Sequence, residues 1–207
     1  MIEIREVGPD RLPEYARIPI AFEVRAVFRV ERLDAGEWGF RLVEEPIPKP
    51  YVKDYDAVED PDGRVQNWPK HFNVSKWGFF IAAEDGEDVG AATVAVHTPA
   101  VHMLENRDDL AVLWDLRVRP ERRRHGIGSN LFQYATGWAR SKGCRQMKVE
   151  TQNTNVPACR FYAAQGCVLG GVNRFGYAGC PAVAHETMLL WYLNLSPASE
   201  NTRSRTG

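Results

Sequence analysis

The stretch LRVRPERRRHGIGS, residues 116–129, decides how the rest of this sequence is interpreted. An apolar strand candidate, Leu110–Val118, runs into a short basic loop that contains Gly126 and Gly128, and an amphipathic helix pattern follows directly. A helix that starts this way leaves unpaired N–H groups and the positive end of its dipole facing outward. Glycine lets a phosphate approach the backbone, and the arginines add charge that can pair with it. The stretch therefore predicts an anion site.

Two common phosphate-binding loops do not fit these residues. A dinucleotide-binding loop needs a third glycine, but Leu131 stands at that position. A P-loop needs Gly-Lys-Ser/Thr, and no such sequence follows Gly128. Considered alone, the stretch could also be a structural turn before a helix, with Arg122–Arg124 as a solvated charge run.

Apolar patterns predict a mixed α/β chain. Alternating or continuous apolar runs predict strands over Met1–Val7, Phe22–Arg32, Trp38–Glu44, Gly78–Ala83, Val89–Val96, Leu110–Val118, Met147–Thr151, Val168–Tyr177 and Glu186–Leu193. Spacing of three and four residues predicts helices from Ile127 to Lys142 and over Val156–Gln165. Asp34-Ala35-Gly36 predicts a hairpin turn, and the proline-rich residues 45–69 predict a long irregular segment that covers or walls a substrate.

Composition excludes several classes of protein. The chain has 207 residues, of which 44% are hydrophobic and 26% charged, as in ordinary globular domains. Its 26 Lys and Arg nearly cancel its 27 Asp and Glu, so we expect no general attraction to nucleic acid or to a membrane surface. The sequence contains neither a signal-peptide pattern nor an apolar run long enough to span a membrane, which predicts a cytoplasmic protein.

Cysteine and histidine spacing gives no metal motif. Cys144, Cys159, Cys167 and Cys180 form no C-x-x-C pair, and the histidines form no H-E-x-x-H pattern. We therefore expect reduced thiols and no metal site.

The basic loop resembles a cofactor loop of a known family. Arg123-x-x-Gly126-x-Gly128, placed after a strand that ends in Leu-x-Val-x-Pro, resembles the acetyl-coenzyme A pyrophosphate loop of the GNAT superfamily of N-acetyltransferases. The resemblance implies that successive amides of residues 124–129 bind the pyrophosphate.

A second motif lies further along the chain. Asn155-x-x-Ala158-x-x-x-Tyr162-x-x-x-Gly166 resembles the later helix of the same family, with Cys167 where that family has an aromatic residue. Asn155 can cap this helix and, by the resemblance, also contacts the cofactor. The two motifs occur in the family's order, and the resemblance covers about residues 75–193.

A narrower resemblance points to one subfamily. The run over residues 150–162 is similar to the E-T-Q-x-x-N-x-x-A-C-x-F-Y run of streptothricin acetyltransferases. Residues 22–24, Trp38 and the Pro-Tyr-x-Lys-x-Tyr run over residues 50–55 resemble the entry segment of that subfamily. The segment 96–109 is longer than we expect there, and it could reshape the acceptor pocket.

The resemblance implies an α/β (α+β) GNAT fold, in which a twisted, mostly antiparallel central sheet flanked by helices splays near Asp115 to admit acetyl-CoA. We expect one domain over residues 1–195, with 1–74 on the acceptor side and 75–193 as the acetyl-CoA-binding core, followed by a disordered polar tail over 196–207. The implied cofactor-binding residues are Leu116, Arg117, Val118, Arg123, Arg124, His125, Gly126, Ile127, Gly128, Ser129, Asn155, Ala158 and Tyr162. The amides of Leu116 and Val118 would hold the pantetheine arm.

The chemistry needs a base and an acid. A lysine-like amine has a pKa of about 10.4, so it must lose a proton before it attacks a thioester. Asp115 and Glu150, on neighbouring strands, could each accept that proton directly or through water, or each could be a structural carboxylate paired with Arg117 or Lys148. The resemblance implies that Tyr162 protonates the departing thiolate; without the motif, a buried helix aromatic is the plainer interpretation.

Aromatic residues near the irregular segment could enclose a cationic acceptor; they are Trp38, Tyr51, Tyr55 and Trp68. Trp191 and Tyr192 are expected in the core or at a homodimer contact.

We expect direct acetyl transfer from acetyl-CoA to a primary amine of a small cationic molecule of the streptothricin type. Alternatives are acetylation of a protein amine or another metabolite, and a coenzyme A-binding sensor without turnover. Nucleic-acid binding through the basic residues 117–124 is disfavoured, because the run fits a cofactor loop and the net charge is only −1.

Overall fold

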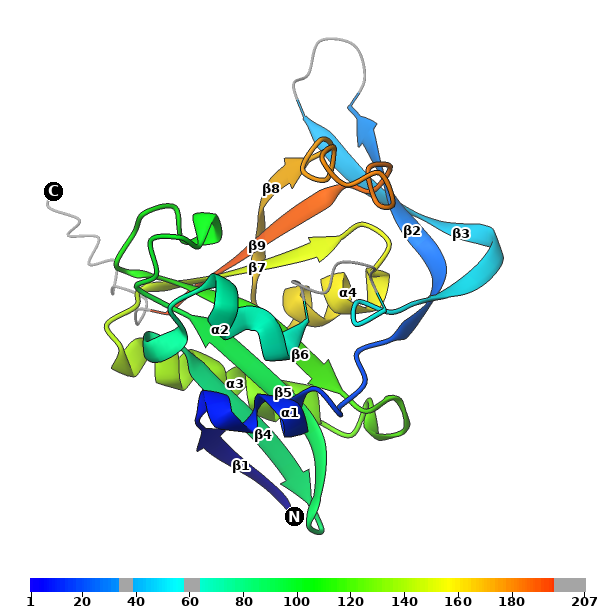
Figure 1. Ribbon diagram of the computed structural model, residues 1–207. Helices are drawn as coiled ribbons and strands as arrows, with labels where there is room; N and C mark the ends of the chain where they lie inside the picture. The colour runs from blue at the N-terminus through cyan, green and yellow to red at the C-terminus, as the bar shows by residue number, and fades with distance from the viewer. Residues whose placement is uncertain (34–38, 58–63, 196–207) are drawn as a thin grey trace, which may run out of the picture.

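The protein is built around one large sheet, seen in a computed structural model that describes residues 1–33, 39–57 and 64–195 (Figure 1). Its seven strands have the order β1-β4-β5-β6-β7-β9-β8. They are β1 (Ile2–Val7), β4 (Gly78–Glu84), β5 (Glu87–Ala95), β6 (Leu110–Val118), β7 (Gln146–Gln152), β8 (Val168–Asn173) and β9 (Met188–Asn194). Neighbours pair antiparallel except β6 and β7, which run parallel. The predicted mostly antiparallel sheet is confirmed.

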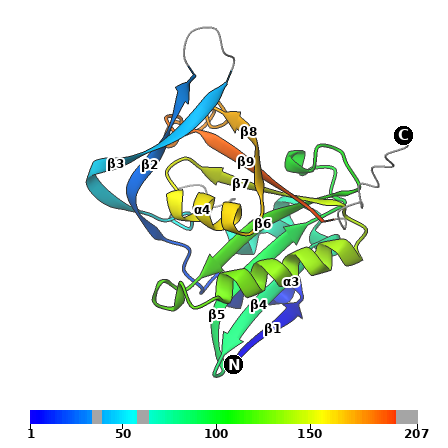
Figure 2. The ribbon, with the colours of Figure 1, turned by 180° about the vertical axis from the view of Figure 1, so that it is seen from behind.

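Helices cover both faces of this sheet. Helices α3 (Ile127–Ser141) and α4 (Val156–Ala164) pack on one face, and the short α1 (Leu12–Tyr15) and α2 (Trp68–His71) lie on the other (Figures 1 and 2). Because both faces are covered, β4 and β5 read as nearly continuous apolar runs whose side chains alternate between two cores.

The sheet opens between its two parallel strands. β6 pairs with β7 only over Leu110–Leu113, opposite Gln146–Val149. Beyond those residues β6 continues to Val118 and β7 to Gln152 without pairing with each other. The pairing of β6 with β5 also skips one residue, Trp114, which marks a bulge where the separation begins. The predicted splay near Asp115 is confirmed.

The second sheet is a long hairpin of β2 (Phe22–Arg32) and β3 (Phe40–Lys53). It is fastened to the end of β7, because the Phe28 amide donates to the Asn153 carbonyl and the Asn153 side chain donates to the Phe28 carbonyl, both at 2.9 Å. The predicted turn at residues 34–36 and Trp38 lie outside the described residues.

The prediction of an irregular segment from Glu45 onward is wrong in its first part, because β3 continues to Lys53. The strand has a single neighbour, so a proline can leave its missing N–H on the open edge. The β2–β3 register also jumps from Ala26↔Pro46 to Val24↔Tyr51, so the intervening residues of β3, which include Pro48 and Pro50, are accommodated in a bulge.

The two C-terminal strands also differ from the prediction. β8 ends at Asn173, and turns occupy the chain from Arg174 to Cys180, where Gly176 and Gly179 interrupt the strand pattern. β9 begins at Met188 and inserts between β7 and β8. Helices α3 and α4 begin and end as expected, with Gly143 and Gly166 in the left-handed conformation after them. The short helices α1 and α2 are not predicted by the sequence, and α2 begins at Trp68, inside the segment that the sequence indicates as irregular.

The remaining segments are placed as follows. Trp191 is buried and donates to Thr151 at 2.9 Å, so it is a core residue. The segment 96–109 sits beside the beginning of β6 and β7, where Arg107 donates to Gln146 at 2.9 Å. None of the described helices is long and apolar enough to cross a membrane.

Close packing of α3 on β5 depends on Gly90. A Cβ at this position would lie 2.9 Å from side-chain atoms of both Ile127 and Leu131, and 3.1 Å from the Arg117 carbonyl oxygen. We expect Gly90→Ala to lower the free energy of unfolding by about 1–3 kcal/mol. Gly137→Ala, on the open side of α3 with no atom within 4 Å of its Cβ, should instead raise it by about 0.5–1 kcal/mol. Urea unfolding of both variants measures the difference; equal effects would contradict the packing argument.

Candidate active site

The loop that the sequence predicts to bind an anion contains a row of backbone N–H groups without hydrogen-bond partners among the described residues. After the 3-10 helix Pro120–Arg122, the chain turns through two left-handed residues, Arg124 (φ 64°) and Gly126 (φ 83°), and enters α3. The first amide of this stretch with a backbone partner is that of Asn130, which donates to the Gly126 carbonyl at 3.0 Å. None of the amides of residues 124–129 donates to another described residue. Such a row at a helix N-terminus suits a phosphate.

The arginines around the loop hold it in place more than they face outward. Arg123 donates to the Val118 carbonyl at 3.0 Å and to the Ala21 carbonyl at 2.6 Å, and burial lowers the pKa of its guanidinium. Arg119 donates to the Asp88 carbonyl at 2.7 Å. Arg124 and His125 remain exposed, and Arg124 is the one positioned to add positive charge at the loop.

The edge of β6 next to the loop presents further free amides. The amide of Arg119 donates to the Val89 carbonyl, which fixes the side of the strand that faces β5. Because backbone N–H groups alternate along a strand, the amides of Leu116 and Val118 point the other way, toward the gap that β7 leaves open. These are the two amides that, by the family resemblance, would hold a pantetheine arm.

Asp115 lies on this strand in a buried ion pair. Arg117, whose side chain is 2% exposed, donates to both Asp115 oxygens at 2.9 and 2.7 Å and also to Asp56 at 2.9 Å. The Tyr15 hydroxyl donates to the same Asp115 at 2.8 Å. Asp115 therefore pairs with Arg117, which is one of the two arrangements that the sequence allows for it. The Arg117 side chain is part of the same hydrogen-bond network.

Glu150 has a different environment. The Tyr177 hydroxyl donates to Oε1 at 2.7 Å, and no described residue donates to Oε2. Lys148, the ion-pair partner that the sequence offers for Glu150, instead pairs with Glu105 at 2.7 Å. Burial raises the pKa of Glu150 above its ordinary 4.5, and this outweighs the hydrogen bond from Tyr177. A half-buried carboxylate with one free oxygen and a raised pKa can accept a proton.

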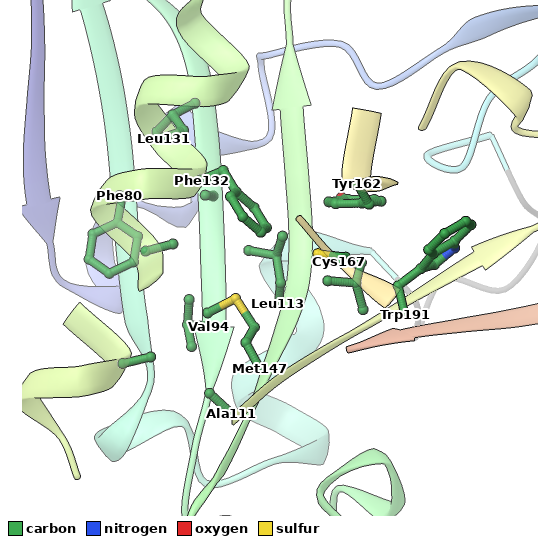
Figure 3. Close-up of a cluster of buried hydrophobic side chains, with 14 of the residues drawn as sticks. Phe80, Val94, Ala111, Leu113, Leu131, Phe132, Met147, Tyr162, Cys167 and Trp191 are labelled. Carbon is green, nitrogen blue, oxygen red and sulfur yellow. The ribbon is translucent and has the colours of Figure 1, made fainter. Parts of the chain in front are cut away.

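Tyr162 lies across the gap, at one end of the core cluster of Figure 3, beside Cys167 and Trp191. Its ring packs against Phe132 and Phe161, with centroids 5.9 and 5.2 Å apart. Its hydroxyl makes no hydrogen bond within the described chain. Burial, reinforced by the charge of Asp115, holds its pKa far above the ordinary 10.0, so the phenol keeps its proton.

The start of α4 ties these parts together. Asn155 caps the helix by accepting from the Ala158 amide at 3.2 Å, as predicted. Its other side-chain atom donates to the Tyr55 hydroxyl at 3.3 Å, and Tyr55 in turn donates to Gln152. Sequence reasoning placed Tyr55 among aromatics near the acceptor but gave it no partner. It did not single out Tyr177, which no motif marks.

Two other aromatic residues that the sequence suggests near the acceptor lie in different environments. Trp68 is 5% exposed and packs against Tyr15 and Trp77, so the expectation that it encloses an acceptor is wrong; its indole fills the core under α1. Tyr51 is 42% exposed on β3.

Comparison with known proteins settles the family. The model of the Acetyltransferase (GNAT) family matches residues 41–167, which is more than half of the chain. The chain belongs to the GNAT acetyltransferases. The match spans the free-amide loop, the opened strands and the helix that carries Tyr162.

Relatives of this GNAT acetyltransferase resemble it along nearly its whole length. A streptothricin acetyltransferase of Escherichia coli is 32% identical, with 90% of this chain and 92% of that protein covered. A solved nourseothricin acetyltransferase superposes with a TM-score of 0.72 at 26% identity, covering 94% and 99% of the two chains. A Bacillus anthracis protein described as a streptothricin acetyltransferase, solved with acetyl coenzyme A, also gives 0.72, at 25% identity and the same coverage.

As a member of this family, the chain is an acetyl-CoA-dependent N-acetyltransferase. The free amides of residues 124–129 and the opened strand edge fit that donor. Among the described residues, no group of three or more His, Cys, Asp or Glu side chains is arranged to hold a metal ion.

The loop geometry predicts a separable effect of Gly126. Gly126 and Gly143 have φ values of 83° and 84°, and a Cβ added to either would have no atom within 4 Å. Alanine at either site should cost about 1–2 kcal/mol of stability through the left-handed backbone. We expect Gly126→Ala alone to raise the KM for acetyl-CoA, because it disturbs the row of amides. Steady-state kinetics with both variants tests this, and an equal rise in Gly143→Ala would refute it.

Proposed function

We propose that this enzyme acetylates a primary amine of a small cationic molecule of the streptothricin type, in the cytoplasm. The observation that carries the proposal is the charge on the side of the sheet that bears Glu150. Arg117 serves two carboxylates, Asp115 and Asp56, while Glu150 has no ion-pair partner among the described residues. This face therefore carries excess negative charge, which favours a cation.

The relatives support the same acceptor. Proteins of Escherichia coli, Bacillus subtilis and Streptomyces lavendulae that carry the name streptothricin acetyltransferase are 32%, 26% and 26% identical to this chain. Each match extends over at least 79% of the chain, so it includes residues on both sides of the opened strands.

For the donor, the proposal assigns the amides of residues 124–129 to the pyrophosphate and the amides of Leu116 and Val118 to the pantetheine arm. The arm would then follow β6 into the gap, toward Asn155, Ala158 and Tyr162. One of the β6 amides can also polarise the acetyl carbonyl as charge develops on its oxygen.

For the chemistry, Glu150 is the favoured base and Tyr162 the acid. Glu150 Oε2 would accept a proton from the acceptor ammonium, and the amine would then attack the thioester carbonyl directly. As the thioester C–S bond breaks, Tyr162 would give its phenolic proton to the departing sulfur, and the proton that the new amide nitrogen releases would return to the phenolate, directly or through water. The raised pKa of Tyr162 keeps the phenol protonated at neutral pH before this step. Asp115 is less suited to the first task, because Arg117 and Tyr15 already donate to its oxygens.

Thiol release from acetyl-CoA tests the proposal directly. The purified enzyme is offered streptothricin, aminoglycosides, polyamines and a lysine peptide, and we expect the fastest release with streptothricin. Tyr162→Phe should lower kcat by about 10²-fold or more and leave acetyl-CoA affinity unchanged. Tyr134→Phe is the matched control, since Tyr134 lies on α3 with its ring against Phe80.

Faster release with the peptide or with another amine class would reject streptothricin as the acceptor. Silence with every amine, alongside tight acetyl-CoA binding, would reject turnover of these acceptors. An unchanged kcat in Tyr162→Phe would remove the phenol from the role of acid.

The raised pKa of Glu150 predicts a pH dependence. A base acts when it is deprotonated, so activity should fall as the pH drops through the pKa of Glu150, and burial places that fall above the ordinary 4.5. We expect Glu150→Gln to lose about 10²-fold in kcat and to lose this acidic limb. The pH profiles of kcat for wild type and variant measure both effects. A variant that keeps the limb would point to another base.

A further inference from the structure

One short segment bridges the two strands that separate. Lys53, at the end of β3, pairs with Glu186, which precedes β9, and both side chains are buried at 11% and 3% exposed. Three residues later, Asp56 accepts two hydrogen bonds from Arg117 of β6, at 2.9 and 3.3 Å. Residues 53–56, hereafter the strap, are therefore fastened to both sides of the opening.

Tyr55 is the residue of the strap whose side chain reaches this opening. Its hydroxyl donates to Gln152 at the end of β7 and accepts from Asn155 at the start of α4. Its ring packs against Phe22, with centroids 5.6 Å apart. The side chain is thus held from three directions while its hydroxyl faces residues of the active site.

The hydroxyl of Tyr55 still has room for one partner. A hydroxyl carries one donor and two acceptor lone pairs, and only one lone pair is used, by Asn155. Burial raises the pKa of Tyr55 well above the ordinary 10.0, so the group stays a neutral phenol that can accept from an N–H. Gln152, which accepts from this hydroxyl, stands two residues after Glu150 on β7, so the Gln152 and Glu150 side chains lie on the same face of that strand.

The strap also contains an ammonium ion at an aromatic face. The Lys53 Nζ lies 5.4 Å from the centroid of the Tyr55 ring while it pairs with Glu186. The chain's own amine therefore shows that this carboxylate and ring together accommodate a cation.

From this geometry we infer that the strap is the acceptor-binding segment, and that Tyr55 accepts a hydrogen bond from the acceptor amine while Glu150 Oε2 takes its proton. The inference rests on the proposed function, because it needs an amine at Glu150. Asp56 is a positioning residue in this scheme, acting through Tyr55. Both roles deepen the acceptor side of the site, which the GNAT motifs do not cover.

Tyr55→Phe tests the contact, because it keeps the ring against Phe22 and removes only the hydroxyl. With the amine that the wild type turns over fastest, we expect the KM for that amine to rise about tenfold and the KM for acetyl-CoA to stay constant. Tyr134→Phe again serves as the control for removal of a tyrosine hydroxyl outside the strap.

Asp56→Asn tests the positioning. Arg117 keeps its pair with Asp115, so this variant leaves no unpaired buried guanidinium and should fold. We expect its acceptor KM to rise at constant acetyl-CoA KM, and Asp56→Glu to recover the lower value because the charge returns.

The outcomes separate this inference from the proposed function. If the wild type acetylates an amine but Tyr55→Phe leaves the acceptor KM unchanged, the inference is overturned and the function stands. If Tyr55→Phe raises both KM values together and lowers the melting temperature, Tyr55 is structural and the inference is also overturned. If the wild type neither turns over nor, by calorimetric titration in the presence of coenzyme A, binds streptothricin or any panel amine, the proposed function fails and the inference fails with it.

Discussion

The separation of β6 from β7 after Leu113 is the constraint on which the rest of the structure depends. Parallel strands that part inside a sheet leave backbone N–H and C=O groups without their ladder partners, and each such group costs free energy when it is buried. Two sets of amides are free here: those of Leu116 and Val118 at the opened strand edge and, after the hydrogen-bonded amides of Arg119, Arg122 and Arg123, those of residues 124–129 at the helix N-terminus. A ligand with a carbonyl-bearing arm and a pyrophosphate end has acceptors that match both sets of amides.

On the other face of the sheet, hydrogen-bonded and ion-paired side chains lie beside the opening. Arg117 is 3% exposed, and a guanidinium at such depth is tolerated only when its donors are satisfied. Asp115, Asp56 and the Ile18 carbonyl satisfy it, and the result is a rigid ionic cluster that uses up the carboxylate nearest to the bulge. Glu150 is not part of this cluster, and Lys148, the nearest lysine in the sequence, pairs with Glu105 instead. Both Asp115 oxygens therefore have donors, whereas Glu150 keeps one oxygen without a donor among the described residues, although the two lie on neighbouring strands beside the same gap.

Local patterns in the sequence predicted what depends on local rules. The strand, basic loop and helix around Gly126 follow from periodicity and glycine placement, and the Asn155 cap follows from its position before Pro157. The prolines of β3 led to the wrong prediction of an irregular segment. A strand can contain prolines when one of its edges has no neighbouring strand, and the sequence does not show that β3 has such an edge. Tyr177 and Asp56 escaped notice for a related reason: their partners, Glu150 and Arg117, are 27 and 61 residues away, and no spacing rule reaches that far. Ion pairs and hydrogen bonds between residues far apart in the sequence decide which of Asp115 and Glu150 keeps an oxygen without a donor among the described residues.

The loop over residues 124–129 and the strap are joined through one N-terminal stretch. Arg123, which fastens the loop to β6, also donates to the Ala21 carbonyl, and Arg117, which fastens the strap, donates to the Ile18 carbonyl. Phe22, the next residue along that stretch, packs its ring against Tyr55. The loop and the segment that carries Tyr55 are therefore both anchored to residues 18–22. Because the same short stretch holds both segments, its geometry sets where the strap lies relative to the loop.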